Sequence, residues 1–466
     1  MGNRPRTVSI HILNDDSLLH VFYLYRPLFT DEDDSAKWRY NGRWWYALAH
    51  VCQRWRNILL SSATYLDLSL LCTYRTSVAD MLAHSPPLPL VVSYFSKNRE
   101  LTTEDEEGII LALKQHDRVR RVRLHNFGTV IQKLIAAMDE ECPALEFLYI
   151  ARPIEDTATI LRFPESFQAP HLRYLSLGSF ALPIASPVLT TAVGLVTLHL
   201  AMVHPSTYFH PITLIRWISL MPQLETLTII LIFSIPNRDV ERQLTHTPII
   251  APITLPNLHH LRLRGVCAYL EALVYRITTP RLKELHIEFF NQLTFSVPRL
   301  PQFIIAAENI RLVKAVLKFG DKVVGVGVDS QEGNAFPFRI AVKCHHLDWQ
   351  ASSMAQISNS LCQIFSAVEH LILQRDVHSE SSEEHSDVDH TEWRKLLRPF
   401  SNVKTLRISE GLVKDISRCL ELEDGGPGLE VLPKLQLLEY SGSGDAYASF
   451  IDARRNAGHP VIPIRV

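Results

Sequence analysis

The chain has few of the features that mark secreted, membrane or metal-binding proteins. Its seven cysteines are widely spaced and form no CxxC pair, which argues against a disulfide framework or a zinc site and favours reduced thiols. The longest apolar run, LTIILIFSI, is far shorter than the roughly 20 residues that span a bilayer, and no apolar run at the start resembles a signal peptide. We therefore expect a soluble intracellular protein, cytoplasmic or nuclear, that does not associate with membranes.

The chain also lacks a charge excess and the common catalytic motifs. With 47 basic and 49 acidic residues the net charge is -2, so no overall field attracts nucleic acid. No GxSxG, Walker A, HExxH or dinucleotide GxGxxG pattern occurs, and GVGVDS and SGSGD are interpreted as glycine-containing turns. The CHH triplet at residues 344–346 lies on a predicted strand, whose alternating side chains suit a single metal ion poorly. We expect a protein that is not an enzyme and binds no cofactor, metal or nucleic acid.

What the chain has in abundance is a repeated pattern, apolar-x-x-apolar-x-apolar. Ten segments carry it, and over the first seven the middle apolar residues are 23 to 34 residues apart. These middle residues are Val122, Leu148, Leu175, Leu198, Leu227, Leu261, Leu285, Leu371, Leu406 and Leu438. The long gap before Leu371 has room for two more units, in IRLVKAVLKFG and PFRIAVKCHH.

A period of about 29 residues with LxxLxL is the signature of leucine-rich repeats, in which stacked units share one core. The pattern predicts an α/β fold over residues 67–466, an irregular leucine-rich-repeat solenoid with a curved parallel sheet and outer helices. We expect PLPLVVSYF to be the first strand. We also expect a helix in TTEDEEGIILALKQH, where Thr103 and Glu106 have capping-box spacing.

Two segments interrupt or end the predicted array. Residues 377–392 contain almost no apolar side chain, which predicts a disordered acidic loop whose histidines, His378, His385 and His390, are solvated rather than bound to metal. Residues 445–466 predict a C-terminal cap, a helix that ends at Gly458 and a short edge strand rich in proline.

The N-terminal region predicts two amphipathic helices. ILNDDSLLHVFYLYRPLF begins with Asn and Asp caps and continues with apolar residues at helical spacing. After a polar insert at residues 27–42, a second helix would place Trp45, Leu48, Cys52, Trp55 and Leu59 on one side. A segment of about 50 residues is too small to be stable alone. It must pack on the solenoid, on a partner, or on both.

This region resembles an F-box. The residues that carry the resemblance are Leu13, Asp16, Leu18, Leu19, Val21 and Phe22, followed by Leu48, Val51, Cys52, Arg54, Trp55 and Arg56. Residues 8–66 are therefore interpreted as an F-box-like helical domain, and the continuation LDLSLLCTYRTSVADMLAHSPPLPLVVSY is similar to the junction in fungal F-box proteins with leucine-rich repeats. Asn14 stands where the family has Pro, and Ser17 stands where it has an apolar residue.

The resemblance implies a substrate adaptor of a cullin–RING ubiquitin ligase of the SCF type. Its F-box would dock on the Skp-family linker subunit, and its repeats would hold an unidentified protein substrate. The implied anchors in the groove of the linker subunit are Leu13, Leu18, Leu19, Phe22 and Val51, while Cys52 and Trp55 would hold the F-box helices together. The alternative is a non-catalytic repeat scaffold in which the N-terminal helices only cap the solenoid.

The alternation of side chains along each strand predicts which residues lie on the open face of the sheet. They are Arg121, Arg123, His125, Phe147, Tyr149, Tyr174, Ser176, His199, His260, Arg262, Arg264, Glu284, His286 and Glu288. This face would be aromatic in the early repeats and basic in two places, which suits an acidic or phosphorylated peptide. The alternative is a solvated sheet face without a binding role.

Overall fold

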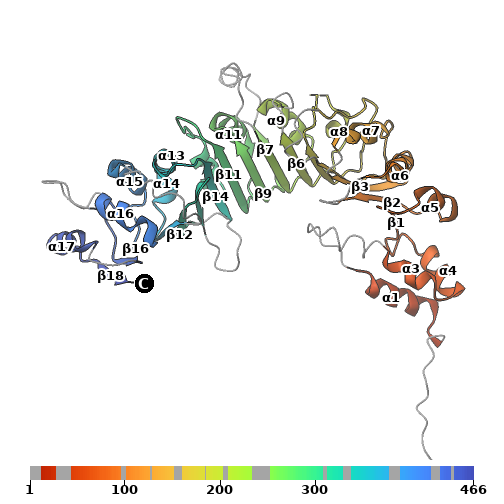
Figure 1. The fold of residues 1–466 in the computed structure, drawn as a ribbon, viewed down its shortest axis with the longest axis horizontal. Coiled ribbons are helices and arrows are strands. Elements are labelled where there is room, and N and C mark those ends of the chain that lie inside the picture. The colour runs from red at the N-terminus through yellow and green to blue at the C-terminus, as the bar shows by residue number, and fades with distance from the viewer. Residues whose placement is uncertain are drawn as a thin grey trace, which may run out of the picture. The chain divides into compact units, whose positions relative to one another are not determined.

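The computed structural model describes residues 12–27, 43–95, 101–125, 128–151, 160–183, 185–202, 208–232, 252–307, 312–328, 337–376, 389–420, 431–441 and 446–465. The chain divides into two compact units, residues 1–195 and 196–466, and each unit combines a sheet with helices (Figure 1). The predicted α/β class with a mostly parallel sheet is confirmed. The partition at residues 66 and 67 stays a prediction, and the polar insert lies, apart from Pro27, outside the described residues. None of the described helices is both long and apolar enough to cross a membrane.

The first unit starts with helices and continues as a parallel sheet. Its helices are α1 (Asp15–Tyr25), α3 (Trp44–Ala49), α4 (Gln53–Ser61), α5 (Val78–His84), α6 (Thr103–Leu113), η2 (Gly128–Val130), α7 (Ile131–Ala136) and α8 (Pro187–Thr190). Its strands are β1 (Leu70–Cys72), β2 (Leu90–Tyr94), β3 (Val119–His125), β4 (Phe147–Ala151) and β5 (Tyr174–Gly178). The strands lie in chain order and every neighbouring pair is parallel.

Three local predictions in this unit are corrected. The predicted second N-terminal helix is two helices, α3 and α4, because Cys52 adopts an extended backbone as the N-cap of α4. The first strand is β1 rather than the predicted PLPLVVSYF, whose residues form β2. The capping box of α6 lies one residue earlier than predicted: Thr102 and Asp105 bond each other's backbone N–H groups.

The second unit contains the remaining repeats. Its helices are α9 (Pro211–Ser219), α11 (Cys267–Val274), α12 (Leu300–Ile305), α13 (Leu347–Ser360), α14 (Cys362–Phe365), α15 (His390–Leu397), η4 (Glu410–Leu412), α16 (Val413–Leu420) and α17 (Ala448–Asn456). Its main strands are β6 (Thr197–Met202), β7 (Thr226–Leu231), β9 (His260–Gly265), β11 (Glu284–Phe290), β12 (Lys314–Phe319), β13 (Val324–Val328), β14 (Phe338–Lys343), β15 (His370–Arg375), β16 (Thr405–Ile408), β17 (Leu437–Tyr440) and β18 (Ile462–Arg465). A small separate pair joins β8 (Ile253–Thr254) to β10 (Ile277–Thr278).

The middle apolar residues of the repeat form the core ladder of the strands in both units. All ten are buried, and within each unit they are register partners on neighbouring parallel strands. The ladders run Val122, Leu148, Leu175 in the first unit, and Leu198, Leu227, Leu261, Leu285 and then Leu371, Leu406, Leu438 in the second. The repeated pattern therefore predicts both the strands and their register, because a one-residue slip would turn these leucines to the opposite face.

The long gap of the repeat is not filled by two successive parallel units. The spatial order there is β11-β14-β13-β12-β15, and β13 is antiparallel to both of its neighbours. The GVGV segment, interpreted as a turn from the sequence, supplies this strand. Gly320 lies just after β12. Its backbone N–H donates a hydrogen bond to the Val323 carbonyl, which closes a tight turn between β12 and β13. So short a connection can only join antiparallel strands, since a parallel pair needs a dozen or more connecting residues.

The C-terminal part contains the helix and edge strand expected from the sequence. Helix α17 ends at Asn456 and is followed by Gly458 at φ 77°. Strand β18 pairs in parallel with β17, and Ile462 donates to the Gln436 carbonyl. The backbone nitrogen of the next residue, Pro463, therefore faces the open edge of the sheet. Because proline has no N–H to donate there, a further strand is less able to pair with this edge.

The acidic loop predicted over residues 377–392 is shorter at its C-terminal end. Asp389 caps α15 by accepting from the Thr391 backbone N–H, so residues 389–392 belong to the start of a helix. Residues 377–388 lie outside the described part of the chain.

Candidate protein-binding surfaces

The start of α1 gives Asn14 a structural role as the N-cap of the helix. The Asn14 side chain accepts a hydrogen bond from the Ser17 backbone N–H at 2.8 Å, so these two residues form an N-cap. Arg54 on α4 then clamps this end: its guanidinium donates to the Asp15 carboxylate at 2.7 and 2.9 Å and to the Leu13 carbonyl at 2.7 Å. The beginning of α1 is therefore fixed against α4 by polar contacts.

One face of α1 is buried in its own chain, and this corrects two predicted anchors. Leu18 and Phe22 are almost completely buried, and the Phe22 ring meets Trp55 edge to face with centroids 5.0 Å apart. These two positions are one helical turn apart, so both point toward α4. They hold the helices together and are not available to a partner. The predicted role of Trp55 between the helices agrees with this contact.

The side of α1 that flanks this buried stripe is apolar and exposed. Val21, Leu24 and Tyr25 share one side of the helix, since they are three and four residues apart, and Leu24 is 69% exposed. We call these three residues the apolar ridge. Among the predicted anchors, Leu13 and Val51 are exposed and Leu19 is half-buried. Val21, Leu24 and Tyr25 were not among the predicted anchors, although helical spacing already placed Val21 and Tyr25 beside Leu18 and Phe22.

The N-terminal helices are also attached to the first strand of their unit. The Trp45 indole N–H donates to the Ser69 carbonyl at 3.1 Å, directly before β1, and the Arg43 guanidinium donates to Thr76 Oγ1 at 2.9 Å. Burial raises the pKa of Tyr46, which lies near Arg43 and Cys72. The helices therefore have a role in covering this end of the sheet as well as any role in docking.

The open face of the first sheet gathers aromatic and cationic side chains. Phe147 stacks on Tyr174 with centroids 4.2 Å apart, and the Arg121 guanidinium lies 5.4 Å from the Phe147 centroid. Arg123 lies 4.1 Å from the Phe95 centroid and 5.5 Å from that of Tyr149. Such cation–π contacts hold an arginine flat against the rings. We call this group, with His125, the aromatic patch.

Arg123 was predicted to be accessible on the open face, but its side chain is buried. The residue is only 6% exposed, because the rings of Phe95 and Tyr149 cover it. Ser176, its neighbour two strands away in register, is also buried. Arg123 therefore supports the patch from below. The half-buried side chains of Phe147, Tyr149 and Tyr174 form more of its accessible part.

The open face of the second sheet carries ion pairs across neighbouring strands. His260 Nδ1 lies 3.0 Å from a Glu284 carboxylate oxygen, and Arg264 Nε lies 3.1 Å from one of Glu288. These pairs follow from the register of β9 and β11, which puts each base opposite an acid. Arg262 is exposed opposite His286. Burial, and then the charge of Arg262, lowers the pKa of His199.

Four of the cysteines lie in surroundings that keep their thiols protonated. Burial raises the pKa of the thiols of Cys72, Cys142, Cys267 and Cys419 to about 12, and a protonated thiol is a poor nucleophile. Within the described ranges no group of three or more His, Cys, Asp or Glu side chains could hold a metal ion.

Known proteins add no family assignment. A comparison with family models finds no match to this chain, and a comparison with curated proteins finds none either.

Proposed function

We propose that this chain is a substrate adaptor of a cullin–RING ubiquitin ligase of the SCF type. The N-terminal helices dock on a Skp-family linker subunit, and the open sheet faces hold a protein substrate. The adaptor makes and breaks no bond itself. It raises the effective concentration of a substrate lysine near the ubiquitin-carrying enzyme, and binding energy alone is sufficient for that task.

The apolar ridge is the observation that carries this proposal. Val21, Leu24 and Tyr25 remain exposed although Leu18 and Phe22 already supply the core contacts of α1. An amphipathic helix whose second face is also apolar fits the mode in which a helix lies in a hydrophobic groove. The same segment resembles an F-box, which suggests the Skp-family linker subunit as the partner. The expected contact residues are now those of the apolar ridge, since Leu18 and Phe22 are buried.

Co-purification of the full chain with a Skp-family linker subunit tests the proposal. Leu24→Asp should lower capture at least about tenfold, because docking would bury a carboxylate in an apolar groove. The fold should persist, since Leu24 is exposed. Leu293→Asp is the matched control, because it makes the same change at a residue of the second unit that is 97% exposed. Phe22→Asp is unsuitable, since a charge against Trp55 would disrupt the helices themselves.

Two outcomes would reject parts of the proposal. Equal capture by Leu24→Asp and Leu293→Asp would show that the ridge is not the docking surface. If the wild-type chain captures no linker subunit, the second candidate holds, a repeat scaffold whose N-terminal helices only cap the sheet. The hydrogen bonds of Trp45 to Ser69 and of Arg43 to Thr76 favour this alternative, because they use the helices to cover the end of the sheet.

A further inference from the structure

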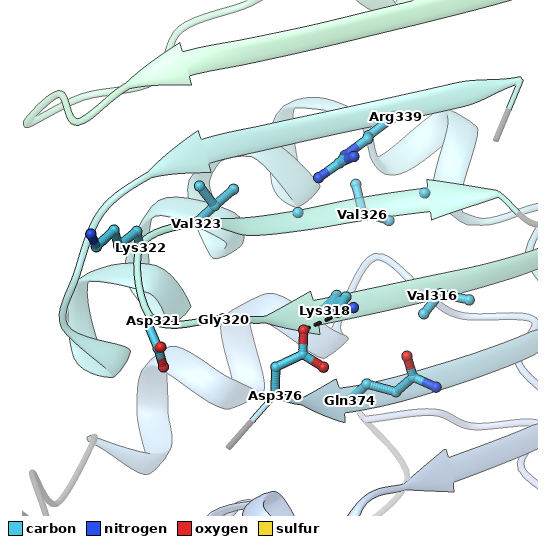
Figure 2. A pocket seen from close by; sticks show the side chains of 12 residues that line it. Val316, Lys318, Gly320, Asp321, Lys322, Val323, Val326, Arg339, Gln374 and Asp376 are labelled. Carbon is cyan, nitrogen blue, oxygen red and sulfur yellow. Dashed lines mark ion pairs between the residues drawn. The ribbon is translucent and has the colours of Figure 1, made fainter. Parts of the chain in front are cut away.

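A hollow lies on the open face of the second sheet, over β13. Its volume is about 540 Å³, and Figure 2 shows Arg339 on one side of it and Lys318, Gln374 and Asp376 on the other. The hollow exists because the two residues of β13 that point to this face, Gly325 and Gly327, have no side chain. The sheet therefore lacks one row of side chains between β12 and β14.

The two walls of the hollow differ in charge. On the β12 side, Lys318 Nζ lies 2.8 Å from an Asp376 carboxylate oxygen, so this cation is already paired. On the β14 side, Arg339 is exposed, and within the described part of the chain it forms no ion pair or hydrogen bond. Figure 2 shows its guanidinium directed over β13. Asp321 and Lys322 line the end of the hollow at the turn between β12 and β13. Of the two long walls, the one formed by Arg339 is thus the one that can receive an anionic group.

Arg339 continues a basic row across three strands. It is the register partner of His286 on β11, which is the partner of Arg262 on β9. The glutamates that flank this row, Glu284 and Glu288, are paired with His260 and Arg264. Arg262, like Arg339, forms no ion pair in the described ranges. The row therefore presents two unneutralised guanidinium groups with an imidazole between them.

We propose that this row and the hollow beside it bind an extended acidic segment of a protein. Arg262 and Arg339 are two strand spacings apart, about 10 Å, which a segment in the extended polyproline II conformation covers in about one turn of three residues, so that positions i and i+3 lie on the same side. Acidic side chains at positions i and i+3 therefore reach both guanidinium groups. Beyond Arg339, the hollow above Gly325 and Gly327 has room for the backbone of the segment. The role of this segment as a ubiquitination substrate rests on the proposed function. The anionic group is a carboxylate or a phosphoryl group.

The test uses the purified full chain and labelled Gly-Ser decapeptides that carry two Glu residues, one to five positions apart. Matching peptides carry phosphoserine or the neutral Gln at the same positions. Fluorescence anisotropy at about 30 mM salt, where screening is weak, should show the tightest binding at a spacing of three and no binding of the Gln peptides. The tighter of the Glu and phosphoserine peptides identifies the anion.

Three variants connect binding to this site. Arg339→Ala should weaken binding about tenfold, as expected for the loss of a charged hydrogen-bonding pair. Gly327→Leu should weaken it similarly by filling the hollow without a change of charge. Lys343→Ala removes a cation from the same strand and face, outside the hollow, and should change affinity less than about twofold.

The proposal is overturned if affinity does not depend on the spacing, if the Gln peptides bind equally well, or if Lys343→Ala acts as strongly as Arg339→Ala. Capture of the linker subunit is measured on the same variants and should be unchanged. If the wild-type chain captures the linker subunit but binds none of the acidic peptides, this site alone is rejected, whereas failed capture by a chain that binds the peptides rejects the adaptor function alone.

Discussion

The strands of the two units use arginine in different ways on their open faces. In the first unit Arg121 and Arg123 lie against the rings of Phe147, Tyr149 and Phe95. In the second unit Arg264 faces Glu288, and the next strands add a glycine-floored hollow. The same repeat therefore builds a rigid aromatic surface in one unit and a charged surface in the other.

The difference shows that the repeat determines the core and leaves the open face free to vary. The leucine ladder is the same in both units. What the open face presents depends on which residue types alternate with the leucines and on which strand comes next in space. In the second unit the inserted β13 changes the neighbours of β11 and β12. Salt should distinguish the two faces, because screening weakens ion pairs and leaves ring stacking unchanged.

Gly325→Ala should have the largest effect and would test the insertion that makes the second sheet different. An added Cβ would lie 3.0 Å from the Ile340 carbonyl oxygen and 3.1 Å from the Ala341 Cβ. We expect the free energy of unfolding to fall by about 2 kcal/mol, measured by urea denaturation. Gly194→Ala in the first unit is the control, since nothing lies within 4 Å of its added Cβ. Equal stability of the two variants would contradict the close packing at β13.

The stacked pair in the aromatic patch should have an intermediate effect. A double-mutant cycle of Phe147→Leu and Tyr174→Leu should give a coupling energy of about 1 kcal/mol, since the rings stack with centroids 4.2 Å apart. The coupling should be the same in low salt and in about 1 M NaCl, because neither ring is charged. A coupling that disappears in salt would mean that the patch is held by charges rather than by its rings.

The ion pair on the second sheet should have the smallest effect and the opposite response to salt. A cycle of Arg264→Gln and Glu288→Gln should give about 0.5 kcal/mol of coupling at low salt, because both side chains are partly exposed, at 23% and 30%. Most of it should be lost at about 1 M NaCl, where the screening length is about 3 Å. If the coupling persists in salt, the contrast between the two faces is wrong.

The strands of the repeat could be predicted because burial leaves a pattern in the sequence. Leu148, Leu261 and Leu406 all lie in strands at the expected register. Strand β1 was missed because three residues are too short to show alternation. Strand β13 was missed because its alternating Gly and Val resemble a glycine-rich turn when the pairing of the strand with β12 and β14 is not known.

The candidate surfaces were predicted less well than the core. A helix with apolar residues on two faces does not show in its sequence which face its own chain covers, so Leu18 and Phe22 were predicted as contact residues where Leu24 and Tyr25 are exposed. Arg262 could be placed on the open face by alternation. The sequence could not show that Arg339 lies in the same row as Arg262, because the pairing of β11 with β14 joins segments far apart in the chain.

The sequence by itself determined the class of fold, the position of the repeated strands and the side of each strand that is buried, because these follow from local alternation and a regular period. The tertiary structure decided the spatial order of β12, β13 and β14, and with it the hollow beside Arg339. It also decided which face of α1 stays exposed. Both depend on contacts between segments far apart in the chain, and a local pattern records that a residue is buried without recording what buries it.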